Sequence, residues 1–113
     1  MSAAHYQLNN LCAILDYNRL QIDGTNTQVM DLRPIEGKWH KFGWNVIEID
    51  GHDFEQILRA YDMRSNKPTI IIAKTIKGKG ISYMENEPKW HGKVPKGVQL
   101  EAAFEELRSG LDG

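Results

Sequence analysis

Polar residues follow three apolar segments of this 113-residue chain. In open α/β sheets, ligands bind at the carboxyl ends of parallel strands, where such residues come together. If the apolar segments are strands, the polar residues therefore indicate a ligand site. In chain order they are Asp16, Asn18, Gln21 and Asp23, then Asp50, His52 and Asp53, then Lys74, Thr75, Lys77 and Lys79.

The first of these groups offers oxygen ligands for a metal ion. Asp16 and Asn18 carry hard oxygen donors of the kind that Mg²⁺ and Ca²⁺ select. Mg²⁺ takes few ligands from a protein and completes its octahedron with water and phosphate oxygens, so one Asn oxygen and one backbone carbonyl suit it. The alternative is that residues 16–24 form only an Asx-type turn after a strand.

The segment KTIKGKG, residues 74–80, has the composition of a phosphate-binding turn. Its glycines allow close approach of the backbone, and its lysines attract anions. It has the spacing of neither the P-loop nor the Rossmann glycine motif. The alternative is a solvated basic turn that leaves a strand.

His91 stands in the segment KWHGKVP. A loop histidine can act as a general acid or base or contact a phosphate, and it can equally be structural or simply exposed. The other histidines lack an H-x-x-x-H spacing, and Cys12 is the one cysteine, so we expect no zinc site. We expect the Cys12 thiol to be reduced and buried.

Strands and helices are expected to alternate along the chain. Segments rich in strand-forming residues indicate strands at 11–16, 44–50 and 69–75. Helix-favouring residues and apolar residues at helical spacing indicate helices at 2–10, 34–42, 54–64 and 99–109. This order predicts an α/β fold, a parallel sheet with flanking helices. Residues 76–98 form a long irregular loop, and such loops are usually functional or disordered.

Local signals add detail to these elements. The unbroken apolar run LCAIL, residues 11–15, predicts a strand covered on both faces. Asp31 and Asp53 are expected to cap the helices that follow them, and Asp23-Gly24 is expected to form a turn.

The charge balance argues against two classes of partner. The sequence has 14 Lys and Arg and 15 Asp and Glu, for a net charge of -1. Nothing in this balance favours nucleic acid or an anionic membrane. No apolar run approaches the roughly 20 residues of a membrane span, and the segment MSAAHYQLNN lacks the features of a signal peptide. We expect a cytoplasmic location.

Four stretches in this order resemble one family: DYNRLQIDG, KWHKFGWNVIEIDGHD, KPTIIIAKTIKGKG and WHGKVP. The family is transketolase and its thiamine-diphosphate-dependent relatives, and the resemblance is greatest to the N-terminal, cofactor-binding subunit of split-gene transketolases. The family's GDG motif is absent from the sequence. The chain therefore resembles the C-terminal portion of that domain. We expect residues 1–113 to form a single partial thiamine-diphosphate-binding domain of the PP type, incomplete at the N-terminus, with residues 76–98 as the active-site loop.

The resemblance implies roles for residues after the first strand. Asn18 matches the Asn that ligates Mg²⁺ through its side-chain oxygen, and Leu20 matches the position whose backbone carbonyl is another ligand. Ile22 matches an apolar residue beside the thiazolium ring.

It also implies roles for residues after the third strand. Lys77 and Gly78 match the segment near the diphosphate and thiazolium of the cofactor, although relatives often carry an apolar residue at the position of Lys77. His91 matches an active-site histidine that approaches the diphosphate and the donor substrate and assists proton transfer.

The implied chemistry is transfer of a two-carbon ketol unit between sugar phosphates, with thiamine diphosphate and Mg²⁺ (or Ca²⁺). The implied partners are a second copy of the chain and a pyrimidine-domain subunit, so activity of this chain alone is not expected. Without the strands that precede it in the family, the LCAIL strand is expected to have an open edge. The alternatives are an enzyme similar to deoxyxylulose phosphate synthase, or a non-catalytic truncated fragment or assembly module.

Overall fold

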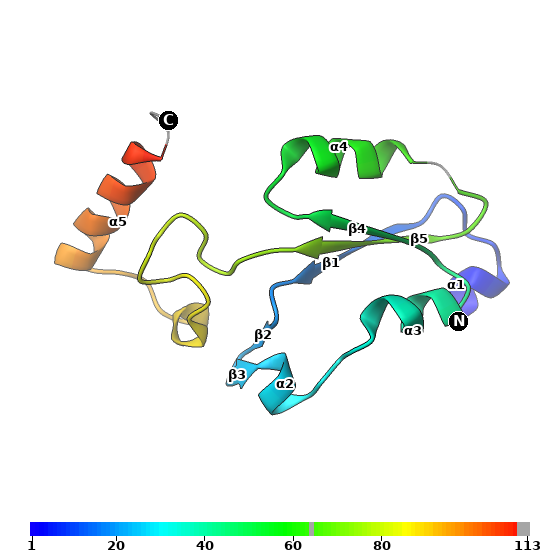
Figure 1. The fold of residues 1–113 in the computed structure, drawn as a ribbon, viewed down its shortest axis with the longest axis horizontal. Helices are drawn as coiled ribbons and strands as arrows, with labels where there is room; N and C mark the ends of the chain where they lie inside the picture. Colours follow the sequence, from blue (N-terminus) through cyan, green and yellow to red (C-terminus); the bar gives the residue numbers. More distant parts are fainter. Residues whose placement is uncertain (64, 111–113) are drawn as a thin grey trace. The chain divides into compact units, whose positions relative to one another are not determined.

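The computed structural model describes residues 1–63 and 65–110. The chain divides into two compact units, which are described separately, and Figure 1 shows the course of the chain. Unit 1 contains Met1–Asn18 and Asp31–Thr75, and unit 2 contains Arg19–Met30 and the described residues after Thr75.

Unit 1 is built on a parallel sheet. Its strands lie in the order β1 (Cys12–Tyr17), β5 (Thr69–Lys74) and β4 (Asn45–Asp50). Cys12 and Asn45 both lie opposite Thr69, while Tyr17 and Asp50 lie opposite Lys74. The strands therefore begin and end together, and their carboxyl ends form one edge. The predicted α/β fold with a parallel sheet is confirmed.

Helices cover both faces of this sheet (Figure 1). α1 (Ser2–His5) and α3 (Ile35–Lys41) lie on one face, and α4 (Phe54–Asp62) lies on the other. Because side chains alternate along a strand, β5 contributes to two separate cores. The first core contains Ile35, Trp44, Ile70 and Ile72, and the second contains Ile49, Ala60, Ile71 and Ala73.

Two predicted helices differ in extent or capping. α1 ends at His5 instead of continuing to residue 10, and Gln7 adopts a φ of 51°, which a helix cannot continue through. Asp31 does not cap α3, because a cap must reach the first helical N–H groups and Pro34 holds that position. The Asp31 carboxylate instead binds the Arg33 guanidinium at 2.7 Å, which lowers the pKa of Asp31 to about 2.

The start of α4 is as predicted. Asp53 is its N-cap, and its Oδ1 atom accepts hydrogen bonds from the backbone N–H groups of Glu55 at 2.9 Å and Gln56 at 3.1 Å. The helix ends at Asp62. The last residue of the predicted helix, Arg64, lies outside the described residues.

Strand β1 lies at an edge of the sheet and is covered on one face only. Ala13 and Leu15 pack against the first core, whereas Cys12 is exposed and Ile14 is 54% exposed. The second core draws its side chains from β4, β5 and α4, so that face of β1 has no cover among the described residues. The predictions of a strand covered on both faces and of a buried Cys12 are therefore wrong, while the expected open edge is confirmed.

Unit 2 contains a small hairpin and the segments after β5. Strands β2 (Leu20–Gln21) and β3 (Gly24–Thr25) are antiparallel and are joined by a turn at residues 22–23, and α2 (Asn26–Val29) follows. The region predicted to be an irregular loop contains a 3₁₀ helix, Pro88–His91, and α5 (Val98–Ser109) follows it.

The core of unit 1 makes a prediction about stability. Ile72→Ala is expected to lower the free energy of unfolding by about 2–5 kcal/mol, because it leaves a cavity at a side chain that is 0% exposed. Ile14→Ala removes the same atoms from a side chain that is 54% exposed, and its expected cost is about 1 kcal/mol or less. Urea unfolding followed by circular dichroism measures both losses. Equal losses of unfolding free energy in the two variants would contradict the conclusion that Ile72 is buried and Ile14 is exposed.

Candidate functional site

The carboxyl edge of the unit 1 sheet collects polar side chains. Asn18 directly follows β1 and is partly buried. Lys74, the last residue of β5, forms an ion pair with Glu48 of β4. Asp50 ends β4, and its carboxylate accepts a hydrogen bond from the His52 backbone N–H at 2.9 Å. The three predicted polar groups are therefore represented at one edge of the sheet, as parallel pairing requires.

Asp16 makes a contact that the sequence does not indicate. Its carboxylate accepts a hydrogen bond from the Thr75 hydroxyl, although 59 positions separate the two residues. Among the described residues, no three His, Cys, Asp or Glu side chains are placed to hold a metal ion together. The oxygen donors that this chain offers near the end of β1 are thus the Asp16 carboxylate, the Asn18 amide oxygen and backbone carbonyls. Such hard donors fit Mg²⁺ or Ca²⁺.

The hairpin of unit 2 carries the next two predicted residues. Leu20 lies in β2 opposite Thr25, and the Asn26 N–H donates to the Arg19 carbonyl at 2.9 Å. Ile22 lies in the turn and is 58% exposed. An apolar side chain held at the tip of a closed hairpin is available to pack against a ring.

Lys77 and Gly78 lie in a tight turn. Gly78 has a φ of +74°, and a Cβ atom at this position would lie 2.6 Å from the Met84 carbonyl oxygen. The Asn86 N–H donates to the Lys77 carbonyl at 3.0 Å, which closes the turn. Only glycine fits both the backbone conformation and the space.

His91 is the last residue of the 3₁₀ helix and is exposed. The neighbouring Trp90 donates its indole N–H to the Tyr83 carbonyl at 3.0 Å, and the centroids of the two side-chain rings lie 5.4 Å apart. The Tyr83 hydroxyl donates to the Gln99 carbonyl of α5 at 2.7 Å. These contacts hold the segment that carries His91 against α5.

A carboxylate of α5 provides a further contact to the same loop. Glu106 accepts hydrogen bonds from the Ser82 backbone N–H and, at 2.8 Å, from the Ser82 hydroxyl. These bonds stabilise the charged form, so they lower the pKa of the Glu106 carboxyl. Sequence reasoning missed this pair, because a glutamate on a helix carries no local signal of a partner 24 positions away.

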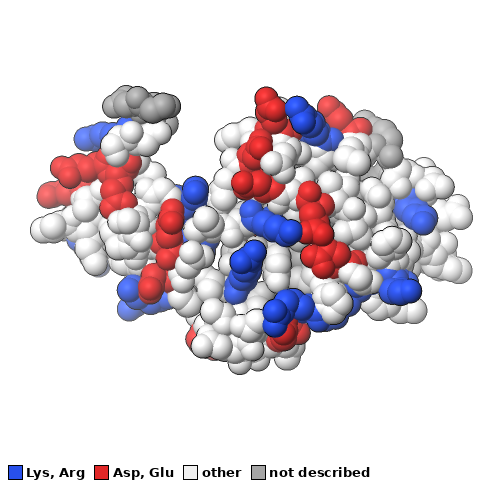
Figure 2. Space-filling model, viewed as in Figure 1, with Lys and Arg blue, Asp and Glu red and all other residues white. Residues whose placement is uncertain are grey.

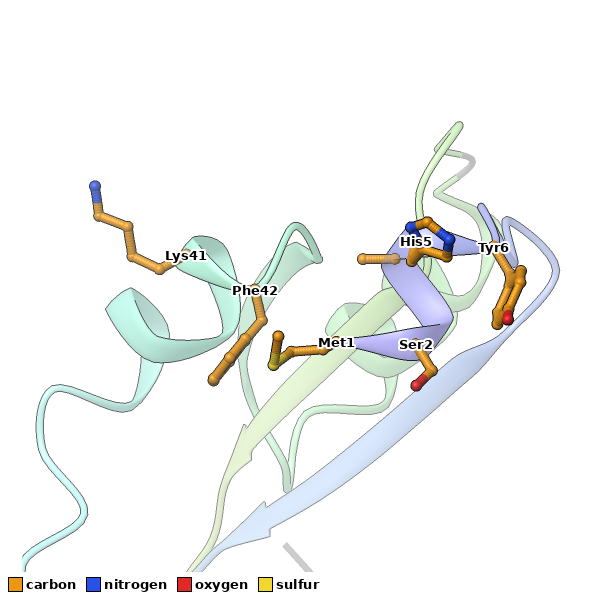
Figure 3. Close-up of a pocket in the computed structure, with 7 residues that line it drawn as sticks. Met1, Ser2, His5, Tyr6, Lys41 and Phe42 are labelled. Atoms are coloured by element: carbon orange, nitrogen blue, oxygen red, sulfur yellow. The ribbon is translucent and has the colours of Figure 1, made fainter.

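A pocket in unit 1 lies apart from the residues predicted for the site. Residues of α1 and of the end of α3 line it, and the Met1 and Phe42 side chains point toward one another there (Figure 3). Because β4 follows α3, this is the amino end of the sheet, whereas open parallel sheets bind ligands at the carboxyl end. The lining residues are Met1, Ser2, Ala4, His5, Tyr6, Lys41 and Phe42.

Charged side chains of both signs are intermixed on the face of the molecule in Figure 2. Several pair locally, among them Arg59 with Glu55 and Lys89 with Glu87, each at 3.1 Å. Because mixed charges largely cancel one another at a distance, this face has no broad positive field. None of the helices in the described part of the chain is long and apolar enough to cross a membrane.

Comparison with known proteins identifies the family. A family model described as the thiamine diphosphate binding domain of transketolase matches residues 1–109. This chain belongs to the transketolase family. The predicted resemblance is thereby confirmed, and of the two thiamine enzymes considered, transketolase is the one that the family match supports.

The relatives of this transketolase chain include proteins named as subunits. It is 44% identical to an apulose-4-phosphate transketolase subunit from Phocaeicola vulgatus, over 99% of this chain and 41% of that protein. It is 39% identical to a 6-deoxy-6-sulfo-D-fructose transketolase subunit from a Clostridium species, over 95% of this chain and 40% of that protein. The chain thus spans about two-fifths of the length of these subunits.

A solved structure agrees with the family. The crystal structure of transketolase from Campylobacter jejuni superposes with a TM-score of 0.87 at 30% identity. The match covers 95% of this chain and 17% of that chain.

The tight turn at Gly78 makes a second prediction. Gly78→Ala is expected to cost about 1–2 kcal/mol or more, because a side chain disfavours positive φ and would also collide with Met84. Gly92→Ala is the matched control, since Gly92 has a φ of -126° and no atom within 4 Å of an added Cβ. Trypsin cleavage after Lys77 should become faster in Gly78→Ala alone. Similar cleavage rates in the two variants would argue against the turn.

The Ser82–Glu106 contact makes a prediction about pH. The pKa of Glu106 is lowered in the folded chain, so the contact is fully formed above the ordinary glutamate pKa of about 4.3 and is lost as the pH falls through the lowered value. The Ser82 amide resonance should shift with that transition in NMR spectra. In Glu106→Gln the contact is expected to be weaker and its shift independent of pH. A Ser82 resonance that titrates identically in both proteins would contradict the assignment.

Proposed function

We propose that this chain is a single partial thiamine-diphosphate-binding domain of a transketolase that transfers a two-carbon ketol unit between sugar phosphates. The observation that carries the proposal is the position of Asn18, which directly follows β1 at the carboxyl edge of a parallel sheet. Ligands bind open α/β sheets at this edge. Membership of the transketolase family supplies the cofactor class.

The metal ion in this proposal is Mg²⁺, or Ca²⁺ in its place. The Asn18 side-chain oxygen and the Leu20 backbone carbonyl would hold it. Mg²⁺ accepts such oxygen donors and keeps positions for water and for phosphate oxygens.

Residues of unit 2 would hold the cofactor. When bound, thiamine diphosphate supplies the electron sink for breaking and forming the carbon–carbon bond. The exposed Ile22 side chain would pack beside the thiazolium ring. Lys77 would attract the diphosphate, and Gly78, which has no side chain, would let the backbone approach it.

His91 would be the catalytic residue of this chain. Its imidazole is exposed at the end of a 3₁₀ helix that Trp90 and Tyr83 hold in place. An imidazole can accept and return a proton near neutral pH, and a fixed position favours such a transfer. His91 would contact the diphosphate and the donor substrate and carry a proton between substrate atoms.

Two protein partners are part of this proposal. Relatives of this chain are named as transketolase subunits, and the chain spans about two-fifths of their length. We therefore propose that a second copy of the chain and a pyrimidine-domain subunit complete the active site, and that the chain is inactive alone.

Cofactor binding tests the proposal. Asn18→Ala is expected to weaken binding of Mg²⁺ and thiamine diphosphate at least roughly tenfold, because it removes a metal ligand. Asn10→Ala is the matched control, since Asn10 precedes the same strand at its opposite end. Isothermal titration, with and without a co-expressed partner subunit, measures both affinities.

Two results would count against the proposal. Unchanged affinity in Asn18→Ala would remove Asn18 as a ligand. Absence of binding at millimolar cofactor, alone and with the partner subunit, would mean that the chain is not a functional cofactor domain.

A further inference from the structure

One threonine connects the ends of all three strands in the unit 1 sheet. Thr75 directly follows β5, the central strand, and its hydroxyl donates a hydrogen bond to the carboxylate of Asp16 in β1. Its backbone N–H also points to the Tyr17 carbonyl, at 3.5 Å. Thr75 thus contacts β1 through both its side chain and its backbone.

The methyl group of Thr75 lies beside Gly51, which follows β4. A Cβ atom on Gly51 would lie 2.5 Å from Thr75 Cγ2 and 3.1 Å from Ala73 Cβ, so the absence of a side chain makes room for the methyl group. The Gly51 N–H donates to the Lys74 carbonyl at 2.8 Å. Because threonine is restricted at χ1, one rotamer presents the hydroxyl to β1 and the methyl group to the chain after β4.

We propose that Thr75 is a positioning residue for the cofactor site. Asn18 lies two residues after Asp16, and Lys77 lies two residues after Thr75. Each is therefore within roughly 7 Å of chain from the Thr75–Asp16 bond. By joining the strand ends, Thr75 fixes the points from which both segments leave the sheet. The roles of Asn18 and Lys77 rest on the proposed function, whereas the Thr75 contacts stand independently of it.

Variants at Thr75 separate its two contacts. Thr75→Val keeps the shape and a methyl group but removes the hydroxyl, and Thr75→Ser keeps the hydroxyl. Thr69→Val is the matched control at the amino end of the same strand, where the buried Thr69 hydroxyl accepts a hydrogen bond from the Asn45 side chain at 3.3 Å. Thr75→Val and Thr69→Val each remove one bond between strands, at opposite ends of β5.

Amide hydrogen exchange of the full chain without ligand tests the strand ends. Thr75→Val is expected to raise the exchange rates of the residue 75 and Gly51 amides roughly tenfold above those in Thr69→Val, because the bond to a charged group is lost. Thr75→Ser is expected to keep the wild-type rates. Equal amide exchange rates in Thr75→Val and Thr69→Val would contradict the claim that Thr75 joins the strand ends.

Titration of the same proteins with Mg²⁺ and thiamine diphosphate tests positioning. Thr75→Val is expected to weaken binding roughly tenfold, as is typical when a group that orients a metal ligand is removed. Thr75→Ser and Thr69→Val are expected to bind as the wild type does. Wild-type affinity in Thr75→Val would overturn the proposal even if its exchange rates rise. A wild-type chain that binds no cofactor would overturn the proposed function, and with it the role of Thr75 in cofactor binding. The amide exchange rates would still decide whether Thr75 joins the strand ends.

Discussion

Strand β5 is the central constraint of unit 1, because its side chains from Thr69 to Ala73 are mostly apolar and all buried. Its backbone N–H and C=O groups need partners on both edges, and β1 and β4 provide them in parallel pairing. Its two faces need apolar cover, which α1 and α3 provide on one side and α4 on the other. The remaining elements of unit 1 are arranged around this strand.

The same constraint places the polar residues at the carboxyl edge. Parallel strands that are paired in register end together, so Asn18, Asp50 and Lys74 lie at one edge although they are far apart in the sequence. The central strand also leads into Thr75, whose contacts reach both neighbours. The parallel pairing that buries β5 therefore also brings these polar groups together at the carboxyl edge.

Unit 2 is held together in another way. Its loop between Ile76 and Gly97 is ordered by polar and aromatic contacts with α5 and within itself, including Ser82 with Glu106 and Trp90 with Tyr83. The apolar stripe of α5 is only partly used, since Ala103 is buried while Phe104 is 51% exposed.

The sequence by itself determined the three strands of the parallel sheet, the helix capped by Asp53, the α/β fold class and the family, because each depends on neighbouring residues or on motifs read in order. It also determined which residues are candidates for the site, such as Asn18 and His91. Tertiary structure alone decided that Cys12 is exposed and that Asp16 accepts a hydrogen bond from Thr75. Burial and long-range hydrogen bonds depend on which elements pack together, and a side chain's own neighbours in the sequence carry no record of a partner 59 positions away.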